Sequence, residues 1–300
     1  MRALSHRPLV MLGMGLLLTL PRPACAQGAE RDRGARTRYL ALNVAIGATA
    51  SIARAVVSGA PIRSTVAKGM LGGSMMSAGM ELIGTESAAT RFAGLQLTAV
   101  GASVARTADN GAPMFSDITL PVYPFYVRVR PGSPSPITAR LSALSTFRLV
   151  SVLSGGHRPS VDWGATIATG APVLRSPRWR LPSASCAAWC EGSFAQHNAG
   201  VIVYSASAGT DYHLARTLAH ESVHLAQQSR DAVLHAIPAS DAALGRLGPT
   251  GSVVSRFFVI DVMLPLRLID EGELRVRGAP RRQSWYETEA RAFAPGGELR

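Results

Sequence analysis

The first third of the chain shows almost none of the alternation between hydrophobic and polar positions that is typical of β-strands. Residues 37–108 are instead rich in Ala, Gly, Ser and Met. We therefore predict two or three helices in this stretch, with bounds near 39–58, 66–83 and 91–106. Small residues would let the backbones of these helices approach one another closely, and they are Gly69, Gly72, Gly73 and Gly79.

The same small residues are also typical of membrane helices, so a membrane-embedded hairpin is the alternative for this region. Charged side chains argue against it. Arg54, Lys68 and Glu81 interrupt the apolar stretches, and each of them would cost several kcal/mol near the centre of a bilayer. A packed helical region is therefore the favoured interpretation.

Alternation of hydrophobic and polar residues begins after a turn-forming cluster at 109–113. It is clear in residues 125–130 and in parts of 137–152 and 163–174, and Pro- and Gly-rich turns separate these stretches. This pattern predicts an antiparallel β meander. A last short strand is expected at 200–204, followed by a loop and a strongly helical segment.

The predicted fold class is α+β. A Gly- and Ala-rich helical region at 27–110 is followed by a β-rich region at 111–300, which carries a helix at 213–228 and a second helix near the C-terminus.

The first 26 residues look like a targeting segment. Two arginines precede an apolar run at 8–20, and small residues stand at Ala24 and Ala26, the two positions that a signal peptidase reads. We predict a signal peptide cleaved after Ala26, and hence a periplasmic or secreted protein. The alternatives are an uncleaved anchor, for which the apolar run is short, and a lipoprotein modified at Cys25, whose preceding residues fit a lipobox poorly.

Charge and cysteine content refine this picture. The formal net charge is +12, so we expect the protein to be attracted to anionic membrane surfaces, less strongly as salt increases. No nucleic-acid-binding motif accompanies the charge, and we expect no nucleic-acid partner. Cys186 and Cys190 remain after cleavage and are expected to form a local disulfide in an oxidising compartment, since two thiols alone make a poor zinc site.

The candidate chemistry lies in the helix at 213–228, which contains the run His220-Glu221-Ser222-Val223-His224. Two histidines four residues apart share one helical face, about 5–6 Å apart, so both imidazoles can reach one tetrahedral ion. Glu221 is turned about 100° from His220, which directs its carboxylate toward a water molecule rather than the metal. The helix is apolar on nearly all sides, which is typical of an interior helix.

Two alternatives stand beside this interpretation. The histidines could be hydrogen-bonded core residues without a metal, although burying two imidazoles and a carboxylate without partners would be unfavourable by several kcal/mol. The site could also bind zinc without catalysing a reaction.

The run resembles the His-Glu-x-x-His helix of zinc metalloproteases, which need a third protein ligand. The metzincin extension is absent, because Gln227 and Arg230 stand where it has Gly and His. A downstream glutamate, as in gluzincin-like enzymes, is the remaining common option. We choose Glu287 in the helical segment 285–294, with Glu289 as a reserve that we expect on the more solvated side.

That segment is similar to the glutamate helix of bacterial stress-response and phage-immunity regulator metallopeptidases. Glu287, Ala290, Phe293 and Ala294 match its pattern, whereas Arg291 replaces the Asn. Arg291 also stands where thermolysin-like enzymes have Asp. Other residues between the two helices remain alternative ligands: His235, Asp270, Glu271 and Glu273.

The resemblance implies a zinc-dependent peptidase with a zincin-like active-site helix, and it makes 111–300 a zinc-metalloprotease-like domain; the N-terminal segment implies that this peptidase is exported. His220, His224 and Glu287 would bind Zn²⁺, Glu221 would be the general base, and Tyr286 or His213 would assist the oxyanion. The strand at 200–204 is expected to be an edge strand that binds an extended peptide substrate. The alternative function is a non-catalytic envelope or membrane-associated protein with a structural or vestigial zinc site, and a part in an outer-membrane barrel ranks lowest. The sequence does not indicate the oligomeric state.

Overall fold

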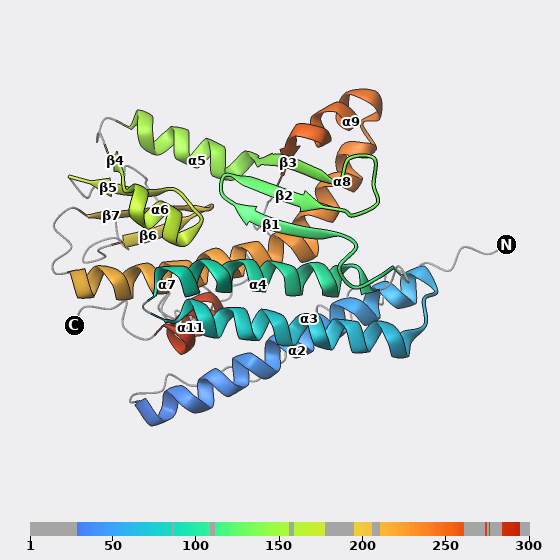
Figure 1. The fold of residues 1–300 in the computed structure, drawn as a ribbon, viewed down its shortest axis with the longest axis horizontal. Helices are drawn as coiled ribbons and strands as arrows, with labels where there is room; N and C mark the ends of the chain where they lie inside the picture. The colour runs from blue at the N-terminus through green and yellow to red at the C-terminus, as the bar shows by residue number, and fades with distance from the viewer. Residues whose placement is uncertain are drawn as a thin grey trace.

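The computed structural model describes residues 29–85, 87–108, 112–155, 159–177, 195–205, 211–260, 274, 276 and 284–294. These residues form a mixed α+β fold that is mostly helical and contains two small mixed sheets. In Figure 1 the sheets lie above a long helix, α7; the helix α4 overlaps α7 in this view, and α2 and α3 lie below it. The predicted α+β class is confirmed at this level.

The N-terminal region is a series of three helices, α2 (Ala29–Ser58), α3 (Ile62–Ile83) and α4 (Ala88–Arg106). The sequence placed their C-terminal ends correctly, whereas each helix begins earlier than expected. The helices pack closely because small residues face one another. A Cβ atom on Gly72 would lie 2.5 Å from the Gly101 carbonyl oxygen, and one on Gly94 would lie 2.5 Å from that of Gly79. The predicted close approach is therefore confirmed.

Within the described ranges, none of the helices has both the length and the apolar character that a bilayer span requires.

The first sheet has the order β1-β2-β3-β8. Its strands β1 (Ile118–Val122), β2 (Phe125–Val129) and β3 (Ile137–Ser142) form an antiparallel meander. β2 and β3 lie in stretches where strands were predicted, whereas β1 was not predicted. The short strand β8 (Phe258–Val259) adds to β3 in parallel, which makes the sheet mixed.

The second sheet has the order β4-β5-β7-β6. Its strands are β4 (Ser160–Val161), β5 (Val173–Ser176), β6 (Ala195–Asn198) and β7 (Val201–Ser205). β5 and β7 are parallel, while the other neighbours are antiparallel. β7 confirms the strand expected near 200–204. The expectation that it is an edge strand is wrong, because β5 and β6 pair with both of its sides.

Two stretches that we interpreted as strands are partly helical. Residues 143–152 belong to α5 (Ala143–Ser154), and residues 163–169 form α6 (Trp163–Thr169). Capping explains both, since the Ser142 side chain accepts a hydrogen bond from the Ser145 amide and that of Asp162 accepts one from Ala165. The alternation was misleading because its apolar side chains do not line a buried sheet face: Trp163 is 70% and Ile167 74% exposed.

The helix α7 (Asp211–Asp231) confirms the predicted interior helix, since its residues from Thr217 onward are all buried. A π-helical turn (Ala232–Ala236), α8 (Ile237–Gly245) and α9 (Gly248–Phe257) follow it, and α11 (Trp285–Phe293) comes near the C-terminus. The sequence placed α11 correctly.

One continuous hydrophobic core joins the N-terminal helices to the rest of the molecule. It includes Ile46 of α2, Met80 of α3, Leu95 of α4, Val223 of α7 and Phe293 of α11. α11 lies between α7 and the pair α2 and α3, and it contacts all three helices (Figure 1). The regions before and after residue 110 thus share a core, and the N-terminal helices reach the helix that carries Glu287.

Candidate metal centre

α7 supplies the first two members of the site. His220 and His224 lie one turn apart on the same face, and their ring centroids are 4.9 Å apart at an interplanar angle of 86°. Both residues are buried, at 9% and 7% exposure. Because neighbouring residues of α7 are packed into the core, the helix has little freedom to reorient the pair.

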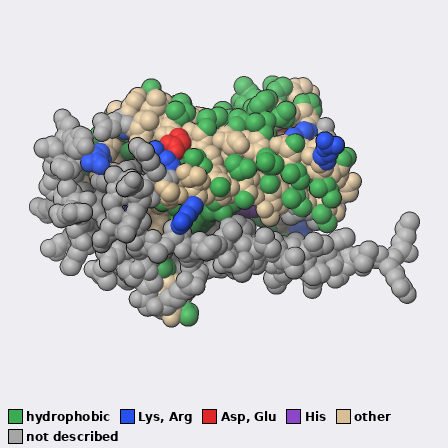
Figure 2. All heavy atoms as spheres, turned by 90° about the horizontal axis from the view of Figure 1, so that it is seen from below, with side chains coloured by type: hydrophobic (Ala, Val, Ile, Leu, Met, Phe, Trp, Pro, Cys, Tyr) green, Lys and Arg blue, Asp and Glu red, His purple; other side chains and the backbone are tan. Residues whose placement is uncertain are grey.

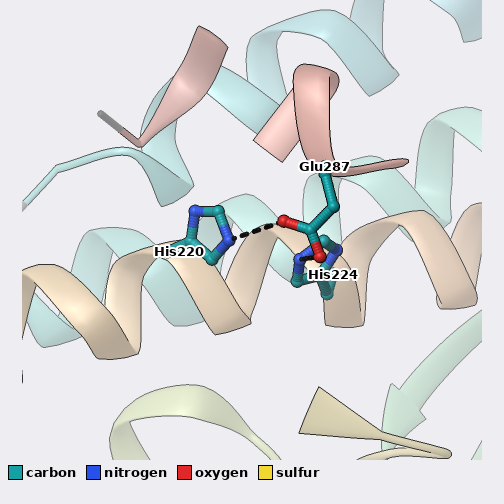
Figure 3. Close-up of side chains that lie close together, drawn as sticks. All are labelled: His220, His224 and Glu287. Carbon is teal, nitrogen blue, oxygen red and sulfur yellow. Dashed lines mark ion pairs between the residues drawn. The ribbon is translucent and has the colours of Figure 1, made fainter. Parts of the chain in front are cut away.

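α11 supplies the third member. Ser284 caps the N-terminus of this helix, and its side-chain oxygen accepts a hydrogen bond from the Glu287 amide at 3.0 Å. This cap fixes the first helical turn, where Glu287 is located. Figure 3 shows the Glu287 side chain descending from α11 between the two imidazoles of α7.

The distances among these three side chains suit a metal ion. His220 Nε2 lies 3.5 Å from one Glu287 carboxylate oxygen, and His224 Nε2 lies 3.5 Å from the other. A direct hydrogen bond would be shorter, at about 2.7–3.2 Å. Two ligands that each sit about 2.0–2.1 Å from one tetrahedral ion are about 3.3–3.4 Å apart. His220, His224 and Glu287 could therefore hold a metal ion, and their donor atoms all lie within 4.8 Å of one another.

The electrostatics of the site favour a cation. Burial alone would raise the pKa of Glu287, but the close approach of the His220 and His224 imidazoles outweighs it and holds this pKa far below its usual value. Burial likewise acts to lower the pKa of His224, whereas Glu287 and the nearby Glu221 carboxylate raise it overall. The carboxylates of Glu287 and Glu221 thus place negative charge next to the His224 ring.

The remaining residues predicted for the site have different surroundings. Glu221 lies on α7 beside His220 and is buried, at 8% exposure. Tyr286 is also buried, and its hydroxyl donates a hydrogen bond to Asp231 Oδ2 at 2.9 Å. His235 is exposed. The side chain of His213 and all of residues 270, 271 and 273 lie outside what the structure describes, as do Cys186, Cys190 and the predicted signal peptide.

The expectation for Glu289 is wrong. We expected this residue on the more solvated side of its helix, but its exposure is 0%. Its carboxylate instead accepts hydrogen bonds from Gln227 at 3.0 Å, Arg230 at 2.8 Å and Asn43 at 3.2 Å. α11 is covered on both sides, by α7 on one and by the N-terminal helices on the other. The face of α11 that carries Glu289 is therefore polar but buried, because Arg230 on α7 and Asn43 on α2 cover it.

Sequence reasoning missed the residues that surround Glu289. Gln227 and Arg230 were noted only because they replace the Gly and His of another zinc motif, although two large polar residues on a buried helix are themselves a signal of buried hydrogen bonding. Asn43 gave no signal, because it lies in a region that the sequence related only to helix packing.

Comparison with known proteins adds no relative: no family model, no curated protein and no solved structure matches this chain. A proposal for its function therefore rests on the sequence motif and the geometry of the site.

Proposed function

We propose that the chain is an exported zinc-dependent peptidase whose metal is held by His220, His224 and Glu287. One observation carries the proposal: two imidazoles on α7 and a carboxylate on α11 converge, although they are distant in the sequence. The exported character rests on the N-terminal sequence pattern alone.

Zinc is the metal that best suits these donors. Two histidine nitrogens and a carboxylate oxygen form one of the ligand sets of catalytic zinc sites, which use three protein ligands and leave the fourth position open. The Glu287 side chain is 23% exposed, compared with 11% and 9% for the side chains of His220 and His224. We infer that a substrate would approach from the carboxylate side.

A bound zinc ion would supply Lewis acidity, which polarises a peptide carbonyl and makes water acidic near neutral pH. We assign the remaining proton transfers to Glu221. Its carboxylate would accept the proton of the attacking water and then deliver it to the leaving amine nitrogen. To assist the oxyanion, the Tyr286 hydroxyl would have to exchange its hydrogen bond to Asp231 for one to the substrate.

The substitution Glu221→Gln tests this proposal. It removes the base but keeps the size of the side chain, so we expect peptide hydrolysis to fall about 10²–10⁴-fold while the zinc content of the purified protein stays near one per chain. Glu81→Gln is the matched control, since Glu81 pairs with Arg36 on the N-terminal helices, and it should change neither quantity.

Each other result would contradict the proposal in a distinct way. If the wild-type protein has no affinity for zinc, the assignment of a zinc site to His220, His224 and Glu287 is wrong. If the Glu221→Gln variant keeps full activity, Glu221 is not the general base. Zinc that is retained by a wild-type protein without hydrolytic activity would favour the non-catalytic envelope protein with a structural site.

A further inference from the structure

A chain of buried hydrogen bonds extends from the candidate metal centre into the N-terminal helices. It begins at His224, whose Nδ1 atom lies 2.7 Å from Gln227 Oε1. The Gln227 amide nitrogen then donates to two acceptors, the Tyr286 carbonyl oxygen at 2.9 Å and Glu289 Oε2 at 3.0 Å. The residues that make these hydrogen bonds are all buried.

These contacts determine which imidazole nitrogen of His224 carries hydrogen. The Gln227 amide has two N–H groups, and a carbonyl and a carboxylate, which only accept, use both. Its oxygen is therefore the atom that faces His224, so Nδ1 must be the donor. In the neutral ring, Nε2 then presents its lone pair on the side of Glu287, where a metal would bind.

The orientation of Gln227 depends in turn on Glu289, and a buried cation fixes Glu289. Arg230 Nη1 donates to Glu289 at 2.8 Å and to Asn43 Oδ1 at 2.7 Å, and Arg230 Nε lies 3.1 Å from Asp231. The Arg230 guanidinium also lies 5.1 Å from the centroid of the Trp285 ring. With an exposure of 0%, Arg230 has a rigid place between α7 and α11.

The N-terminal helix α2 also takes part in this hydrogen-bond network. Asn43 Nδ2 donates to Glu289 at 3.2 Å and to the Tyr39 carbonyl oxygen at 3.1 Å. The Tyr39 hydroxyl lies 2.6 Å from Thr288 Oγ1 on α11. The N-terminal helix therefore contacts the glutamate-bearing helix at two points within one of its turns.

We propose that Gln227 and Asn43 are positioning residues of the metal centre. Gln227 holds the His224 ring with Nδ1 protonated and Nε2 directed to the side of Glu287, where the metal would bind, and Asn43 extends this support from α2 through Glu289. The metal-binding consequence rests on the proposed function, whereas the tautomer is a property of the metal-free protein. His220 differs, since its buried Nδ1 has no hydrogen-bond partner among the described residues.

The first experiment records ¹⁵N chemical shifts of the imidazoles in the metal-free protein, at a pH where the rings are neutral. We expect the wild-type His224 ring to be the Nδ1–H tautomer and Gln227→Leu to lose this preference. A wild-type ring that is mainly the Nε2–H tautomer would overturn the proposal, and this outcome does not depend on whether a variant folds. If the wild type binds no zinc, the proposed function fails, yet this measurement still tests Gln227.

The second experiment measures zinc affinity by competition with a chelator. Loss of a group that orients a metal ligand typically lowers affinity 10–100-fold, and we expect this for Gln227→Leu and a loss of several-fold for Asn43→Ala. Ser77→Ala is the matched control, because it removes a buried contact of α3 with the Leu40 carbonyl of α2 and should leave affinity within about twofold. Equal affinities in wild type, Gln227→Leu and Asn43→Ala would overturn the proposal.

Discussion

At the scale of single residues, Glu287 and Glu289 lie in one helical turn but have different roles. Glu287 and Glu289 are separated by about 200° around α11, so one faces the imidazoles of α7 and the other faces Arg230 and Asn43. The first is a candidate metal ligand. The second neutralises a buried cation.

This division predicts opposite effects for two equivalent substitutions. Glu287→Gln should lower zinc affinity more than a hundredfold, because a zinc ligand is lost. Glu289→Gln should retain zinc better but lower the free energy of unfolding by about 1.5–3 kcal/mol, because it removes one of the two carboxylates that pair with the buried Arg230 charge and leaves Asp231 as the other. Chelator competition and urea unfolding of the metal-free variants measure the two effects. The reverse order of affinities would make Glu289 the ligand.

At the scale of elements, the position of Glu287 in the site depends on the short helix α11. Nine residues make a marginal helix by themselves, so α11 relies on its cap and on burial between α2, α3 and α7. Its cap residue, Ser284, is bonded to the amide of the candidate ligand. Helix stability and ligand position are therefore coupled here.

Ser284→Ala tests this coupling. Loss of a serine cap typically lowers the free energy of unfolding by about 1 kcal/mol, and we expect zinc affinity to fall several-fold with it, because the first turn of α11 carries Glu287. Ser142→Ala is the matched control, since Ser142 caps α5 through an equivalent contact. It should produce a similar loss of stability in urea unfolding without a change in affinity. Equal affinities in both variants would contradict the coupling.

At the scale of the whole molecule, the candidate centre lies where the N-terminal helices, α7 and α11 meet in one core. A metal held by His220, His224 and Glu287 would link α7 to α11 and thereby strengthen a junction that already includes α2. Binding to the folded state alone stabilises that state by mass action.

Zinc should therefore stabilise the entire fold. At a free zinc concentration about 100 times Kd, the free energy of unfolding should rise by about 2.7 kcal/mol. This corresponds to a rise in Tm of roughly 4–5 °C for a chain of this size. Differential scanning calorimetry with and without a chelator measures it, and His224→Ala should abolish the shift. An unchanged Tm in saturating zinc would argue against a site that joins the two helices.

The surface of the molecule bears on its surroundings. On the face drawn in Figure 2, hydrophobic side chains are widespread, Lys and Arg side chains are scattered among them, and acidic side chains are few. Together with the net charge of +12, this suits contact with anionic surfaces. Association with membranes stays a prediction.

Local patterns in the sequence determined the parts of this protein that depend on local forces. The three N-terminal helices, the strands β2 and β3, the interior character of α7 and the helix around Glu287 all follow from composition, periodicity and spacing. The spacing of His220 and His224 also placed both imidazoles on one face, since helical geometry alone decides that. The alternation in residues 143–152 and 163–169 misled because caps at Ser142 and Asp162 outweigh it.

Only the tertiary structure decided which elements meet. The interior position of β7 depends on pairing with strands on both sides, and the burial of Glu289 depends on α2 packing over α11. The support that Asn43 gives to a histidine on α7 passes through three helices that are far apart in the chain. Hydrophobic periodicity reports that a face is buried, but it does not report what buries it, and that choice is made by long-range packing.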